Sequence, residues 1–129
     1  MRTVKIVAVW ALQIVVGLLF LMLGIMKFRD PSWVRNFARW GYPNGFYLVI
    51  GVLEAAGGVA VLVPPLASYG ALLLMAIMTG AAITHLVHGE TQRLMVPVVY
   101  LLLCGGVAWL RRRSAWRSRP VRAQPPAVT

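Results

Sequence analysis

The chain has 129 residues, of which 60% are hydrophobic and only 12% are charged, and its mean hydropathy is +0.76. A soluble domain of this size has too much surface for its volume to hide so much apolar area, so the composition excludes a water-soluble fold as well as a disordered chain. The net charge of +10 does not indicate nucleic-acid binding, because six of the 13 basic residues lie between Arg111 and Arg122, next to an apolar run, where basic clusters contact lipid headgroups and fix membrane topology.

Four apolar runs follow one another along the chain, at about residues 4–26, 46–63, 66–87 and 94–110. Each is close to the roughly 20 residues that a helix needs to cross a hydrocarbon layer of about 30 Å. The first run is too long for the apolar core of a signal peptide and is not followed by a cleavage site, so we expect it to be retained. Because a backbone in lipid must satisfy its own hydrogen bonds, the sequence predicts an all-α fold, a membrane four-helix bundle within residues 1–112.

The connection between the first two runs carries an amphipathic pattern. Trp33, Phe37 and Trp40 recur at spacings of four and three, with Arg35 and Arg39 between them. This spacing predicts a helical turn or two lying at the membrane surface. Two interpretations stay open: the aromatic face anchors the chain in the interface, or it forms a lid over a site below.

The other connections are short and define the topology. Pro64 and Pro65 cannot continue the second helix, so the second and third spans form an antiparallel hairpin. Four spans place both termini on one side, which carries eight basic residues against five on the other. The positive-inside rule then predicts cytoplasmic termini. Residues 113–129 are basic and then rich in proline and alanine, which predicts a disordered cytoplasmic tail that contacts anionic lipid.

A single carboxylate interrupts the second run, in the segment IGVLEAAGGVAVLV that extends from Ile50 to Val63. Eight residues into a helix that begins near Phe46, Glu54 lies roughly 12 Å deep, close to the middle of the bilayer. A lone acid there costs on the order of 2.5–3.5 kcal/mol, so it must face the bundle interior and find a partner, or stay protonated. We predict that Glu54 is the centre of an intramembrane polar site; a contact that only holds two helices together is the alternative.

The predicted topology gathers the outer ends of the other spans around Glu54. The first span ends in a lysine, the third ends in a threonine and two histidines, and the fourth contains a tyrosine. Each has a structural alternative, such as a lysine that snorkels to the interface or a tyrosine that only packs. Glu90 and Arg93, three residues apart in the last connection, are expected to pair at the surface. The candidate polar site comprises Lys27, Glu54, Thr84, His85, His88 and Tyr100.

Small residues accompany the acid and indicate helix contacts. Gly51 and Gly58 share its helix face at spacings of three and four, with Gly57 beside them, and Gly17 and Gly24 form a stripe on the first span. Such stripes let helix backbones approach closely in membranes. We therefore expect the first and second spans to pack along these glycines.

The sequence contains no motif for an intrinsic cofactor. His85 and His88 could join Glu54 around a metal ion, but a histidine pair three residues apart, without cysteines or further carboxylates, is a weak signal, so no metal site is predicted. A bis-histidine haem needs histidines on two spans, and both belong to the third. Cys104, the only cysteine, is interpreted as a small buried hydrophobe.

Three segments resemble the DoxX-like family of small membrane proteins: GLLFLMLGIMKF, IGVLEAAGGVAVLVPPLASYGALLLM and HLVHGE. The resemblance covers about residues 17–110 and implies a four-helix membrane bundle in which Lys27 and Glu54 form a charged pair. Two patterns carry most of it, a glycine-x-x-lysine-phenylalanine end of the first span and a glycine-x-x-glutamate-x-x-glycine-glycine core of the second. They correspond to Gly24, Lys27 and Phe28, and to Gly51, Glu54, Gly57 and Gly58.

The resemblance implies function only loosely. Some relatives are subunits of an archaeal thiosulfate:quinone oxidoreductase, others are linked to redox complexes, and distant animal relatives assist receptor assembly. We expect a quinone- or redox-linked subunit of the bacterial inner membrane, with a quinone as its ligand and a membrane or peripheral redox protein as its partner. A non-enzymatic assembly factor, chaperone or structural subunit is the alternative, and a small proton-coupled transporter is the third. Homo-oligomerisation and catalysis stay open.

Overall fold

The computed structural model describes residues 2–117, with side chains described as far as residue 112. This part of the chain contains five helices and no strands, which confirms the predicted all-helical fold class. The helices are α1 (Arg2–Arg29), α2 (Ser32–Arg39), α3 (Phe46–Leu62), α4 (Pro64–Val87) and α5 (Met95–Arg117).

Each predicted apolar run corresponds to one helix. Three of these helices are long and apolar enough to cross a membrane: α1, α4 and the part of α5 from Met95 to Arg112. α3 is also apolar but shorter, with 17 residues. The ends of α1 and α5 extend beyond the predicted runs because lysine and arginine are good helix formers. α5 thus continues into the predicted tail, of which residues 118–129 lie outside the described residues.

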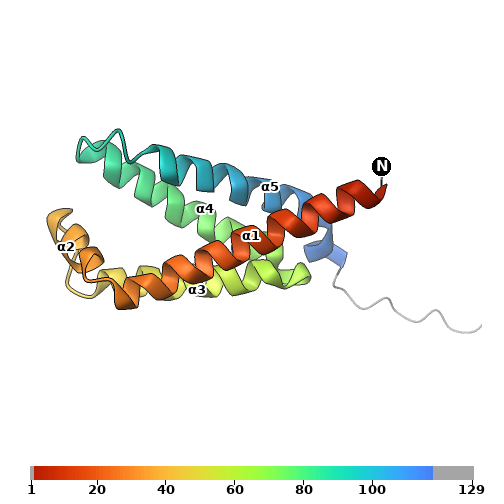
Figure 1. Cartoon of the computed structure of the whole chain (residues 1–129), viewed down its shortest axis with the longest axis horizontal. Coiled ribbons are helices and arrows are strands. Elements are labelled where there is room, and N and C mark those ends of the chain that lie inside the picture. Colours follow the sequence, from red (N-terminus) through yellow and green to blue (C-terminus); the bar gives the residue numbers. More distant parts are fainter. Residues whose placement is uncertain (1, 118–129) are drawn as a thin grey trace, which may run out of the picture.

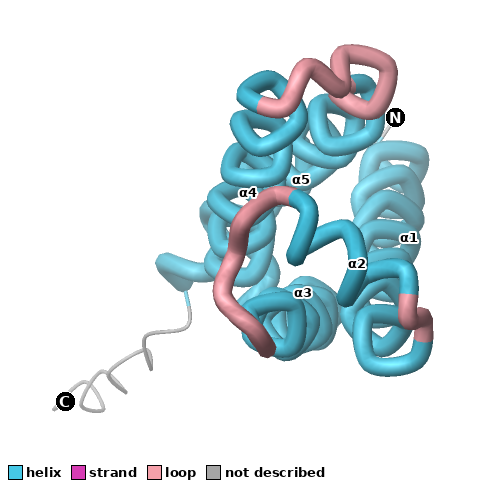
Figure 2. The backbone as a smooth tube through the Cα atoms, turned by 90° about the vertical axis from the view of Figure 1, so that its left-hand side faces the viewer, coloured by secondary structure: helices cyan, strands magenta, loops and turns pink. Residues whose placement is uncertain are grey.

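The long helices form two pairs, α1 against α3 and α4 against α5, which are joined where α3 packs on α4 (Figure 1). At one end lie the start of α1, the turn from α3 to α4 and the late part of α5; we call it the termini end. At the opposite end, the α2 end, the two pairs spread apart (Figure 1). Figure 2 looks onto this end and shows α2 lying across it, between the pairs.

The α1–α3 contact depends on glycines. A Cβ added to Gly24 would lie 2.5 Å from the carbonyl oxygen of Gly51, and one added to Gly58 would lie 2.7 Å from that of Gly17. Distances this short exist only because backbone meets backbone without an intervening side chain. Gly57 faces the other way, and a Cβ there would lie 2.7 Å from the side chain of Leu74 on α4.

Buried side chains fill the bundle between its middle and the termini end. This core draws on four helices and includes a cysteine: Val16, Phe20, Val61, Leu74, Cys104 and Val107. A polar contact also joins α1 to α5 there, where Arg111 Nε donates a hydrogen bond of 2.7 Å to Oε1 of buried Gln13. The two helix pairs are therefore in contact across the termini end.

Candidate functional site

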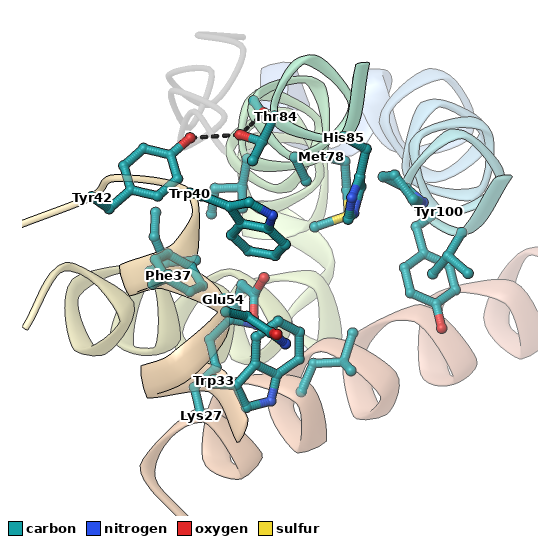
Figure 3. A pocket seen from close by; sticks show the side chains of 18 of the residues that line it. Lys27, Trp33, Phe37, Trp40, Tyr42, Glu54, Met78, Thr84, His85 and Tyr100 are labelled. Atoms are coloured by element: carbon teal, nitrogen blue, oxygen red, sulfur yellow. Dashed lines mark hydrogen bonds and ion pairs between the residues drawn. The ribbon is translucent and has the colours of Figure 1, made fainter. Parts of the chain in front are cut away.

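A cavity of about 770 Å³ occupies the α2 end, between the two helix pairs (Figure 3). All five helices contribute to its wall, and most of the side chains that line it are apolar or aromatic. Such a volume is within the usual range of small-molecule sites, about 300–1,000 Å³. The polar groups of the wall therefore decide what the cavity can bind.

One wall carries a buried ion pair. Lys27 Nζ, near the end of α1, lies 2.6 Å from Glu54 Oε2 on α3, and the residues are only 5% and 2% exposed. Gly51 lets the end of α1 come this close to α3, because a Cβ at position 51 would lie only 3.0 Å from the Cβ of Lys27. The ring of Trp33 covers the ammonium from the α2 side, with Nζ 4.0 Å from the ring centroid. Removed from water, such a cation–π contact stabilises the ammonium by about 2 kcal/mol.

The opposite wall comes from α4 and α5 (Figure 3). Thr84 Oγ1 and the hydroxyl of Tyr42 are 2.5 Å apart and share a hydrogen bond. The buried Nδ1 of His85 has no hydrogen-bond partner among the described residues. Tyr100 packs edge-on against Phe20, with ring centroids 5.7 Å apart. This wall therefore combines aromatic surface with a few groups that can form hydrogen bonds.

The end of the cavity is covered by aromatic rings from α2 and the segment after it. We call Trp33, Phe37, Trp40 and Tyr42 the aromatic cover. Phe37 is its buried centre, and the ring centroids of Trp40 and Tyr42 both lie 5.4 Å from that of Phe37. Pairs of this kind contribute about 0.5–1.5 kcal/mol each beyond the area that they bury.

Backbone features before and after α2 fix the position of the cover. Asp30 Oδ1 accepts a hydrogen bond of 2.9 Å from the backbone N–H of Ser32, which starts the helix. That bond holds the pKa of the Asp30 carboxyl below its usual range. After the helix, the chain turns at Gly41 and Gly45, both with φ of 84°, which side chains other than glycine rarely tolerate.

Glu90, in the turn between α4 and α5, attaches the cover to the far side of the bundle. Its Oε1 accepts a hydrogen bond of 2.6 Å from Trp40 Nε1. Its Oε2 lies 3.3 Å from both Arg39 Nη2 and Arg93 Nη1. The predicted Glu90–Arg93 pair is thus confirmed, and it belongs to a larger group. The bond from Trp40, helped by the charges of Arg39 and Arg93, holds the pKa of Glu90 below its usual value.

Five of the six predicted site residues line this cavity: Lys27, Glu54, Thr84, His85 and Tyr100. The structure places His88 elsewhere. α4 ends at Val87, and His88 follows as an exposed C-cap whose Nδ1 lies 2.8 Å from the carbonyl oxygen of Thr84. His88 follows Thr84 by four residues, but its ring lies against the Thr84 carbonyl and does not line the cavity. Within residues 2–117, no three His, Cys, Asp or Glu side chains are grouped closely enough to hold a metal ion.

Sequence reasoning did not assign several groups of the site. The spacing of Trp33 and Trp40 signalled an amphipathic helix without saying which side it faces. Tyr42 gave no signal, because its partner lies 42 positions away along the chain. Glu90 was expected to bind Arg93 alone, and its bond to Trp40 spans 50 positions.

These features define an all-helical protein with membrane-length helices and an apolar cavity that holds a buried ion pair in its wall. A family model, described as the DoxX-like family, matches residues 11–107, and the chain belongs to this family. No curated protein and no solved structure matches the chain.

Proposed function

We propose that the chain is a multi-pass protein of the bacterial inner membrane. It crosses the membrane four times, through α3 as well as through the three longer helices α1, α4 and α5. At 1.5 Å per residue the 17 residues of α3 extend about 25 Å, enough to cross most of the hydrocarbon layer. The sequence carries eight basic residues in its two terminal segments against five in the other connections, which favours cytoplasmic termini and a cytoplasmic tail at 113–129. The cavity then lies in the outer half of the membrane.

We propose further that this cavity binds a quinone, and that the chain acts as the membrane subunit of a redox system. The observation that carries the proposal is the buried Lys27–Glu54 pair in the wall of an otherwise apolar space. Ionisable residues inside a membrane are expensive and indicate a functional site by default. The aromatic cover supplies flat surfaces against which a ring can stack.

The chemistry of the pair suits both redox states of such a ligand. An ammonium has three N–H donors, and Glu54 takes one of those on Lys27, so a quinone carbonyl can accept another. A hydroquinone hydroxyl can instead donate to the Glu54 carboxylate. Reduction of the quinone takes up two electrons and two protons; a partner redox protein supplies the electrons, and Glu54 is placed to pass protons. Tyr100 and His85, on the opposite wall, can bind the second oxygen of the ring.

The two alternative functions have less support in the geometry. An assembly factor would dock another membrane protein most readily on small-residue helix faces, but Gly17, Gly24, Gly51 and Gly58 are in contact between α1 and α3. A proton-coupled transporter needs a path to the termini end, where the bundle is filled by core residues such as Phe20, Leu74 and Val107. Neither alternative is favoured by a specific observation.

Titration of a short-tailed quinone into the purified chain in lipid nanodiscs tests the proposal. We expect saturable binding that weakens on the order of 10- to 100-fold in the double variant Lys27→Met/Glu54→Leu, because hydrogen bonds to charged groups contribute about 1.5–3 kcal/mol each. Changing both partners avoids leaving one charge buried alone, so the fold should survive.

Thr79→Val is the matched control. Thr79 is a polar residue within a span, but its hydroxyl bonds the carbonyl oxygen of Met75 and does not line the cavity. Binding should therefore be unchanged. A double variant that keeps its helical circular dichroism and binds the quinone as tightly as the unaltered chain would overturn the proposal.

A further inference from the structure

The cavity has two borders of different character. Toward the α2 end it is closed by the aromatic cover, which polar contacts join to α4 and to the turn after α4. Trp40 and Arg39 bind Glu90, and Tyr42 shares a hydrogen bond with Thr84. The second border is the line along which α1 and α5 face each other, and it is built differently.

The contacts between α1 and α5 that the structure shows lie between the termini end and the middle of the bundle. A Cβ on Gly106 would lie 3.3 Å from Leu12, and nearer the α2 end the ring of Phe20 packs against that of Tyr100. One helical turn further on, Leu23 of α1 and Val96 of α5 both line the cavity. The cavity therefore separates the two helices there, and Figure 1 shows them diverging toward the α2 end.

The edges of this gap are apolar and exposed. Val96, in the first turn of α5, lines the cavity and is 53% exposed. Met26, three residues after Leu23 on α1, is 42% exposed. In a membrane such side chains meet lipid tails.

We propose that the ligand reaches the cavity sideways from the outer leaflet, through the gap between α1 and α5, and not from water past the aromatic cover. This inference rests on the proposed function and specifies its ligand. The ligand is an amphiphile dissolved in the membrane, with a ring-shaped head that reaches the Lys27–Glu54 pair and an alkyl tail that stays in the gap among lipid tails.

The route by which a ligand enters determines its association and dissociation rates but not its binding affinity. The test therefore measures rates. The reporter is tryptophan fluorescence in a full-length chain carrying Trp10→Phe, Trp109→Phe and Trp116→Phe, which leaves Trp33 and Trp40 beside the cavity. Quinone in the membrane is mixed with this chain in vesicles, and quenching is followed in a stopped-flow instrument. Val96→Phe should slow association and dissociation by the same factor, on the order of 10, because the larger side chain must be displaced at each passage.

Two matched variants separate the two borders. Val98→Phe is the control on α5, since Val98 is 38% exposed and does not line the cavity, and it should leave both rates unchanged. Glu90→Gln loosens the aromatic cover. It should leave the association rate unchanged, because the ligand does not pass the cover on its way in. Faster association in Glu90→Gln, with Val96→Phe indistinguishable from the reporter chain, would overturn the lateral route.

A tail-length series provides a second measurement that needs no change in the gap. Each added CH₂ lowers the aqueous concentration of an alkyl quinone about fourfold at a fixed mole fraction in lipid. Access from the bilayer predicts equal association rates for short and long tails, whereas access from water predicts a steep fall. A chain that binds no quinone at all overturns the proposed function together with this route; binding whose rate falls with tail length overturns the route alone.

Discussion

The two ends of the bundle hold the same helices together in different ways. At the termini end the two helix pairs touch through side chains of the core, and the α3–α4 contact is so close that a Cβ on Gly70 would lie 2.9 Å from the carbonyl oxygen of Gly57. At the α2 end the pairs separate, and aromatic rings and charged groups cover the space between them. The first arrangement leaves no room for a ligand, and the second creates it.

The charged residues are also distributed differently between the two ends. The filled end depends on small and apolar residues, which hold helices together in lipid by close contact. The open end concentrates its ion pairs, Lys27–Glu54 in the wall and Glu90 with its arginines at the cover. Charges in a membrane protein cost free energy, so their concentration around a cavity supports the ligand site proposed above.

The largest effect is expected where backbones touch. In Gly58→Leu the new side chain would begin 2.6 Å from the backbone nitrogen of Leu21, which cannot move unless α1 leaves α3. We expect a loss of more than about 3 kcal/mol of stability, at the upper end for overpacking. Denaturation in detergent, followed by circular dichroism, measures it.

Gly80→Leu is the matched control for that change. A Cβ on Gly80, in the cavity wall, meets no atom within 4 Å, so the larger side chain enters open space. The variant should fold as the unaltered chain does. Equal stability of the two leucine variants would contradict the comparison between a filled and an open end.

The next effect concerns the ion pair of the open end. Lys27→Met removes one partner and leaves the buried Glu54 alone, which should cost about 3 kcal/mol. The double variant Lys27→Met/Glu54→Leu should recover most of that loss, because neither charge remains. The same denaturation experiment measures both. A double variant as unstable as the single one would contradict this expectation. The loss would then come from poor packing of methionine and leucine, and not from leaving the Glu54 charge without its partner.

Much of this architecture could be predicted from the sequence because its signals are local. The apolar runs gave the long helices, and the glycine spacing around Glu54 indicated the face on which α3 meets α1. The topology placed Lys27 among the candidate groups near Glu54, and the family resemblance implied that the two form a charged pair. Hydrophobicity, residue size and helix periodicity were sufficient for the helices and their contact face.

The contacts of the open end could not be predicted in the same way. An anchor in the interface and a cover over a cavity have the same amphipathic spacing, so Trp33 and Trp40 left both interpretations open. Which carboxylate meets Trp40 depends on how the two helix pairs diverge, and no local pattern encodes that divergence. His88 was assigned to the site because it follows Thr84 by four residues. α4 ends at Val87, and the helical spacing alone did not show where the ring of its C-cap residue lies.

The smallest effect is expected at the attachment of the cover. Because the hydrogen bond from Trp40 and the charges of Arg39 and Arg93 lower the pKa of Glu90, the carboxylate stabilises the closed cover above its ordinary pKa of 4.5. That contribution is lost as the pH falls through the lowered pKa. Acrylamide quenching of Trp33 and Trp40, in the chain with its other tryptophans changed to phenylalanine, should therefore increase on acidification below about pH 4.5.

Glu90→Gln should show the more accessible tryptophans already at neutral pH and respond little to acid. Arg93→Gln removes one charge but leaves the bond from Trp40, so it should give an intermediate result. The denaturation midpoint should change little in either variant, because Glu90 attaches only α2 and the filled end holds the long helices together. Quenching that is the same in all three chains at every pH would show that the aromatic contacts around Phe37 hold the cover alone.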